Sequence, residues 1–78
     1  MKKTLDKFQI GESGIVVKVD GERKIKRRLY DMGITKDAEI YLRKKAPLGD
    51  PVEVRVRSYE LSLRLCEASL ITLEVKNA

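Results

Sequence analysis

The stretch of residues 40–57 reads IYLRKKAPLGDPVEVRVR, in which two alternating runs flank a proline-rich turn. In the second run, valines at positions 52, 54 and 56 alternate with charged residues, the period-2 pattern of a half-buried strand. The first run alternates in the same way, with Ile40 and Leu42 on one face. Between the runs, Pro47 and Pro51 fix φ and Gly49 permits a positive φ, so the chain is expected to turn. The stretch therefore predicts a β-hairpin.

An amphipathic helix is predicted upstream of the hairpin, over residues 22–32. Its apolar positions follow the i, i+4, i+7 spacing that places side chains on one helix face: Ile25, Leu29 and Met32. The other faces carry five basic side chains: Arg23, Lys24, Lys26, Arg27 and Arg28. Asp20 is a candidate N-cap, and Gly33 stands where a left-handed C-terminal cap is needed.

Three further segments complete the predicted fold. Residues 15–19 follow a glycine-containing turn and predict a strand, and residues 71–75 alternate and predict the last strand. Leu61, Leu65 and Ala68 stand at helical spacing, which predicts a short helical turn before the last strand. Strands this few and short avoid exposed edges most simply by curling. The sequence thus predicts a mainly β fold, a small, partly open β-barrel with one short α-helix and a second short helical turn.

Length and composition indicate a compact, soluble domain with one core, because a chain of 78 residues buries only about 60% of the surface that its unfolded form exposes. The net charge of +5 favours acidic partners, but 12 carboxylates among 17 basic side chains argue against a uniform cationic surface. The lone Cys66 cannot close an intramolecular disulfide. No leader is evident, and no apolar stretch approaches the roughly 20 residues that span a bilayer. A cytoplasmic location is expected.

The residues needed for common catalytic and metal sites are missing from the sequence. Histidine is absent, which removes Ser-His-Asp and Cys-His catalysis and histidine-ligated zinc sites. No GxxxxGKS/T or GxGxxG motif is present. Cys66 lacks a base and co-ligands, and is predicted to be a small buried core residue beside Leu65. Two carboxylate pairs could hold a hard divalent ion weakly, but ordinary solvated charges are favoured: Glu60 with Glu67, and Asp50 with Glu53. No enzyme activity, catalytic residue, cofactor or metal site is predicted.

Two surface features leave alternatives open. The basic helix face, together with Tyr30, Tyr41 and Tyr59, could contact phosphates, bases or lipid headgroups. The alternative, a solvated face with tyrosines at the barrel rim, is favoured because acidic residues at positions 20, 22 and 31 dilute the positive field. Pro47 and Leu48 either pack back on the barrel or form a docking surface, with equal weight.

Three blocks of sequence carry a resemblance to a known family. They are RRLYDMGI at residues 27–34, APLGDPV at residues 46–52, and LSLR at residues 61–64 followed by Glu67 and Ala68. In these blocks and their spacing the chain, from Gly11 to Val75, resembles the FeoA family of ferrous iron transport accessory proteins. The resemblance implies an SH3-like barrel, with residues 1–78 as a single domain. It also implies a cytosolic protein, placed near the inner face of the cytoplasmic membrane, that cooperates with the transporter FeoB and has no catalytic residues.

Two departures from the family pattern lie in turns. Lys36 and Asp37 stand where members often have Pro-Gly, and Ser58 stands where a glycine often precedes the tyrosine. Aspartate tolerates left-handed conformations better than most non-glycine residues, so the fold is expected to be retained.

The leading hypothesis is an interaction module that docks to FeoB, the membrane transporter with a cytosolic GTPase domain, and modulates iron(II) uptake. The predicted partner-binding residues are Arg27, Arg28, Tyr30, Pro47, Leu48 and Tyr59. Charge reversal at Arg27 and Arg28 is expected to weaken docking without unfolding the domain. The alternative is a nucleic-acid-binding β-barrel that uses the basic helix face. Transition-metal sensing, implied by a related domain in some metal-dependent repressors, ranks last. Pairing of two copies through an edge strand is left open.

Overall fold

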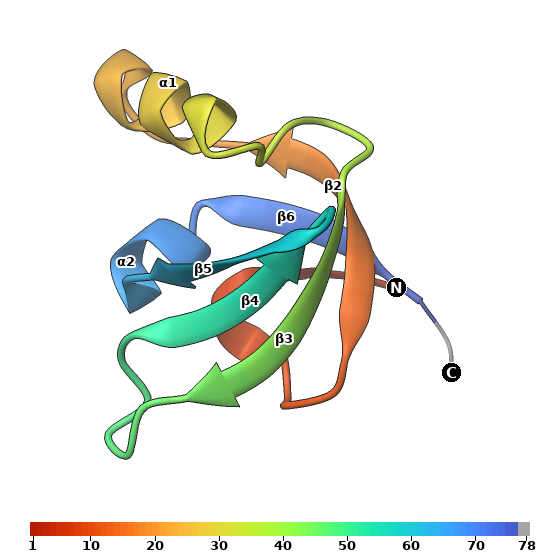
Figure 1. The fold of residues 1–78 in the computed structure, drawn as a ribbon. Coiled ribbons are helices and arrows are strands. Elements are labelled where there is room, and N and C mark those ends of the chain that lie inside the picture. Colours follow the sequence, from red (N-terminus) through yellow and green to blue (C-terminus); the bar gives the residue numbers. More distant parts are fainter. Residues whose placement is uncertain (77–78) are drawn as a thin grey trace.

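The computed structural model describes residues 1–76, which form a coiled antiparallel sheet with short helices (Figure 1). The strands are β1 (Lys2–Thr4), β2 (Ser13–Val19), β3 (Glu39–Lys45), β4 (Val52–Val56), β5 (Tyr59–Leu63) and β6 (Ile71–Val75). The helices are the 3₁₀ helix η1 (Leu5–Lys7) and the α-helices α1 (Arg23–Asp31) and α2 (Leu65–Ala68). The strand order is β1-β6-β2-β3-β4-β5, so β1 and β5 are edges and the sheet of the described chain is not closed. The predicted mainly β, partly open architecture is confirmed.

The quoted stretch forms the predicted hairpin. β3 and β4 pair antiparallel, with Ile40 opposite Val56 and Leu42 opposite Val54. These four residues are fully buried, as is Val52, so the alternating pattern correctly identified the inner face. Burial of each such aliphatic side chain contributes about 1.5–3 kcal/mol. The rest of the core comprises Leu5, Phe8, Val16, Val19, Leu29, Ile34, Ala38, Leu63, Ala68, Ile71 and Leu73.

α1 begins one residue later and ends one residue earlier than predicted. Its apolar stripe faces the sheet, with Leu29 fully buried and Ile25 and Met32 packed against the core. The predicted N-cap is wrong: Glu22 occupies this position and makes no side-chain capping hydrogen bond. The N–H of Asp20 instead donates to a carbonyl just before β6 at 2.8 Å, which keeps Asp20 at the end of the sheet.

Gly33 forms the predicted left-handed cap of α1, with φ at +91°. The N–H of Gly33 donates to the carbonyl of Tyr30 at 2.9 Å, and the N–H of Ile34 donates to the carbonyl of Leu29 at 3.0 Å. This pair of hydrogen bonds is the Schellman motif, in which the last carbonyls of a helix find donors beyond its end. Ile34 and Leu29 are both fully buried, so the cap also fixes the helix to the core.

β5 is a strand that the sequence analysis did not predict. Leu61 lies in β5 opposite Val54, and only Leu65–Ala68 are helical, so the helical spacing was misleading for Leu61. The two-residue turn after β4 brings the chain back alongside β4. Pairing of β5 with β4 outweighs the helical spacing of a few apolar residues. β1 and η1 were also not predicted, although η1 buries Leu5 in the core.

The two turns that depart from the family pattern contain the only non-glycine residues of the described chain with positive φ. Asp37 has φ at +73°, in agreement with the tolerance expected of aspartate. In the turn between β4 and β5 the left-handed residue is Arg57, which precedes Ser58 and has φ at +57°. The Arg57 guanidinium donates to the hydroxyl of Thr35 at 3.3 Å, which links the two turns.

Candidate functional site

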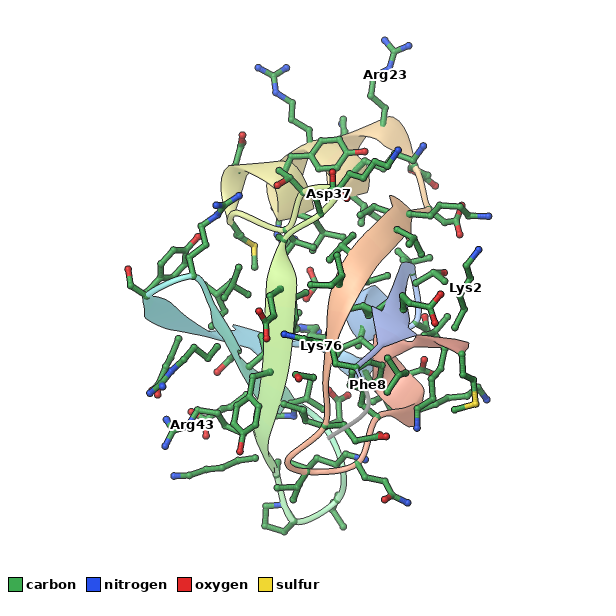
Figure 2. The ribbon with its side chains drawn as sticks, turned by 90° about the vertical axis from the view of Figure 1, so that its right-hand side faces the viewer. Lys2, Phe8, Arg23, Asp37, Arg43 and Lys76 are labelled. Carbon is green, nitrogen blue, oxygen red and sulfur yellow. The ribbon has the colours of Figure 1, made fainter. Side chains whose placement is uncertain are left out.

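The six predicted partner-binding residues do not form one surface. α1 lies at one end of the molecule and the loop between β3 and β4 lies at the opposite end, in both views (Figure 1; Figure 2). Tyr59, at the start of β5, contacts the segment that follows α1. The α1 end therefore holds Arg27, Arg28, Tyr30 and Tyr59, and the loop end holds Pro47 and Leu48.

Tyr59 attaches the end of α1 to the sheet. Its hydroxyl donates a hydrogen bond to the carbonyl of Met32 and lies against Gly33. The residue is still 41% exposed, so part of it remains accessible to a partner. Its first role is therefore to position the helix, because it fixes the residues that cap α1.

Arg28 forms an ion pair that joins α1 to α2. A guanidinium nitrogen of Arg28 lies 2.7 Å from Oε2 of Glu67, whose side chain is only 10% exposed. The other carboxylate oxygen of Glu67 accepts the backbone N–H of Arg64 at 3.0 Å. Because a buried carboxylate needs partners, Arg28 is committed to this contact although its own side chain is 65% exposed.

Charge reversal at Arg28 is now expected to destabilise the fold, unlike the expectation from sequence. Arg28→Glu would place a second carboxylate against Glu67 and remove its cation, at a cost of about 1–3 kcal/mol. Arg27→Glu is the matched control, because Arg27 has no ion pair within residues 1–76. Thermal unfolding followed by circular dichroism should show a lower Tm for Arg28→Glu alone. Equal melting temperatures would mean that the Arg28–Glu67 pair does not stabilise the fold.

The loop between β3 and β4 presents an apolar side chain to solvent, since Leu48 is 96% exposed. The N–H of Ala46 donates to the carbonyl of Pro51 at 3.0 Å, and the N–H of Gly49 donates to the carbonyl of Ala46 at 2.7 Å. These bonds close the loop, and Pro47 at its tip is exposed as well. Leu48 therefore does not pack back on the barrel, which was one of the two alternatives left open by the sequence. The other alternative, a docking surface, stays a prediction.

A hollow of about 410 Å³ lies between the two ends. Its walls are Arg28, Asp50, Pro51, Glu67 and the segment from Ser62 to Arg64. A carboxylate oxygen of Asp50 accepts the N–H of Leu65 at 2.9 Å, which fixes the base of the Leu48 loop to the start of α2. The hollow thus offers a recess beside an exposed apolar residue on a loop whose base is fixed by hydrogen bonds.

A second hollow, of about 430 Å³, lies on the outer face of β3 and β4 and was not predicted. It is lined by Asp37, Ala38, Glu39, Tyr41, Arg55 and Arg57. Strand alternation places Tyr41 and Arg55 opposite each other on this face, but only the folded turns bring positions 37 and 57 beside them. The lining contains two guanidinium groups and two carboxylates, so the hollow favours neither charge.

Cys66 is exposed, so the prediction of a buried core cysteine is wrong. α2 is only four residues long and turns Glu67 and Ala68 inward, which leaves Cys66 on the outer side. Within residues 1–76, His, Cys, Asp and Glu form no group of three or more that could hold a metal ion. None of the described helices has the length and hydrophobicity needed to cross a bilayer.

Comparison with known proteins places the chain in a family. The FeoA domain model matches residues 3–75, which is nearly the whole chain. The chain belongs to the FeoA family. The resemblance inferred from the three sequence blocks is therefore confirmed.

This FeoA chain is similar to three known proteins. The Fe(2+) transport protein A/Fe(2+) transporter FeoB fusion protein of Porphyromonas gingivalis is 32% identical over 71 residues, which cover 91% of this chain and only 8% of the fusion protein. The FeoA-like protein of Clostridium acetobutylicum is 40% identical, with a TM-score of 0.91 over 99% of this chain and 90% of that one. FeoA of Stenotrophomonas maltophilia, solved with zinc and described as an SH3 domain protein, is 29% identical, with a TM-score of 0.80 over 92% and 89%. The expected SH3-like fold is confirmed.

Proposed function

We propose that this FeoA-family chain is a non-catalytic accessory protein that docks to the ferrous iron transporter FeoB and modulates iron(II) uptake. The observation that carries the proposal is the Porphyromonas gingivalis relative, in which an FeoA-like region and FeoB are parts of one polypeptide. Fusion by a short flexible linker holds two domains at effective concentrations in about the millimolar range. A separate chain with the same role needs a docking surface that supplies the association itself.

The loop end is the surface that best suits a protein partner. Leu48 is almost fully exposed on a loop closed by backbone hydrogen bonds, so little backbone conformational entropy is lost when it is buried. Binding energy at protein interfaces is concentrated in a few side chains that enter a partner's pocket. The adjacent hollow beside Asp50 and Arg64 can in turn receive a side chain from the transporter. We place this contact on the cytosolic part of FeoB, at the inner face of the membrane.

The test is binding of purified chain to the FeoB of the same organism, as the isolated cytosolic domain and as full transporter in mild detergent. Leu48→Asp should weaken the affinity by about 30-fold, which corresponds to about 2 kcal/mol at a central contact. Tyr30→Asp, an exposed substitution on α1 at the opposite end, is the matched control and should bind like wild type.

Two outcomes would overturn parts of this proposal. If Tyr30→Asp weakened binding and Leu48→Asp did not, the transporter contact would lie at the α1 end, as the sequence-based choice of Arg27 and Tyr30 allows. If wild-type chain bound neither form of FeoB, docking itself would be rejected.

A further inference from the structure

α1 has two opposed stripes with the same spacing. Its inner stripe, formed by Ile25, Leu29 and Met32, packs on the barrel. Arg23, Arg27 and Tyr30 also follow the i, i+4, i+7 spacing, and at 100° per residue they lie on the side opposite the inner stripe. Lys24 and Lys26 flank this outer stripe. The outer face of α1 is defined here as Arg23, Lys24, Lys26, Arg27 and Tyr30.

Almost all of the net charge of the chain resides on α1. The helix contains five basic residues and one acidic residue, a net +4 out of +5 for the chain. Of its basic residues, Arg28 alone is paired with a carboxylate within residues 1–76. Elsewhere basic and acidic side chains nearly balance. The protein therefore has one electropositive pole, on the outer face of α1.

The outer face is directed away from the body of the protein. α1 lies at one end of the molecule in both views (Figure 1; Figure 2). Arg23 extends from it into solvent (Figure 2). Arg27 is exposed, and Tyr30 is 45% exposed. Both hollows lie elsewhere, since neither is lined by a residue of this face. A row of long basic side chains without a pocket is better suited to binding a broad anionic surface than to binding a small ligand.

We propose that the outer face of α1 rests on the anionic phospholipid headgroups of a membrane. Basic side chains at such a surface attract acidic lipids, and a tyrosine prefers the headgroup level because one end of its ring system is apolar and the other polar. The inner stripe stays on the barrel, so the contact is electrostatic and superficial, without insertion of the helix. With α1 on the lipid surface, the Leu48 loop at the opposite end faces away from the bilayer.

A bilayer fits this helix better than nucleic acid does. A helix that reads a DNA groove places its N-terminal residues against the bases, with phosphates nearby. At α1 exposed carboxylates lie at both ends: Asp20 and Glu22 before the helix, and Asp31 and Asp37 at and beyond its end. A flat surface touches the projecting outer face first and leaves Asp20, Glu22 and Asp37, which lie outside the helix, in solvent. Asp31 lies on the same side of the helix as Lys24 and offsets one of its cations. The charge distribution therefore favours lipid.

The test is sedimentation of the chain with vesicles of phosphatidylcholine alone or mixed with phosphatidylglycerol. Binding should require phosphatidylglycerol and disappear at about 1 M salt, where the Debye length is about 3 Å. The variant Arg23→Gln, Lys24→Gln, Arg27→Gln should bind about a hundredfold more weakly, at about fivefold per cation. Glutamine is a good helix former, so α1 should persist. The control variant Lys2→Gln, Lys7→Gln, Lys44→Gln has the same net charge as the α1 variant, but it removes exposed lysines from β1, η1 and β3. It should bind almost as wild type does.

Three results would overturn the proposal. Wild-type chain could fail to bind phosphatidylglycerol vesicles at low ionic strength. The two triple variants could lose binding equally, which would assign it to net charge and not to α1. Duplex DNA could bind more tightly than the vesicles and displace them in an α1-dependent manner, which would assign the outer face to nucleic acid. None of these depends on FeoB, so lipid binding and transporter docking can fail separately.

Discussion

Leu29→Ala should lower the free energy of unfolding by about 2–5 kcal/mol, the range for large-to-small substitutions in well-packed cores. Leu29 is fully buried and is the only residue of α1 in the core, so the helix has no second buried anchor to compensate. For a chain of this length the total stability is on the order of 4–12 kcal/mol. Chemical denaturation followed by far-ultraviolet circular dichroism should show a large drop in the unfolding midpoint.

Leu48→Ala is the matched control for this prediction. The chemical change is the same, but Leu48 is 96% exposed, so the free energy of unfolding should change by less than about 0.5 kcal/mol. Similar losses in the two variants would mean that Leu29 does not anchor α1 to the barrel. Leu48→Ala should also weaken binding to FeoB, although less than Leu48→Asp does. The two alanine variants thus distinguish the core role of Leu29 from the docking role of Leu48.

The parts of the fold that were predicted are those in which local pattern and tertiary environment agree. Residues 52–56 alternate because one face of β4 is buried, and that face is apolar along its whole length. The apolar stripe of α1 that contains Leu29, and Gly33 as the C-terminal cap of the helix, were predicted correctly for the same reason. β5 was missed because the residues next to Leu61 and Leu63 in the sequence are exposed, and no β-branched residue lies between the two leucines. Its strand conformation comes from the adjacent edge of β4.

The site was less predictable than the fold because it depends on contacts between distant segments. Arg28 looked like one more basic residue on a solvated helix, and only the folded chain brings Glu67 against it. The helix face and the proline-rich loop were both predicted to contact the partner, but they lie at opposite ends of the molecule (Figure 1). Cys66 was placed in the core because cysteine is often buried. A four-residue helix has only one inward side, which Glu67 and Ala68 occupy.

Gly33→Ala should destabilise the fold for two separable reasons. A left-handed conformation costs a residue with Cβ about 1–2 kcal/mol, and Gly33 has φ at +91°. The added Cβ would also collide with the hydroxyl of Tyr59, which must then leave the carbonyl of Met32, at a further cost of about 0.5–1.5 kcal/mol for the lost hydrogen bond. Denaturant unfolding should therefore show a loss of about 1.5–3.5 kcal/mol, the sum of these two contributions.

Two further variants separate the contributions. Gly49→Ala has a similar φ of +87° but no atom within 4 Å of the added Cβ, so it should lose only the backbone part, about 1–2 kcal/mol. Tyr59→Phe removes the hydroxyl that the Cβ at position 33 would meet, so Gly33→Ala should cost less in a Tyr59→Phe background than in wild type. If Gly33→Ala cost the same in both backgrounds, the tyrosine would not restrict position 33, and its role in fastening α1 to the sheet would rest on the Met32 hydrogen bond alone.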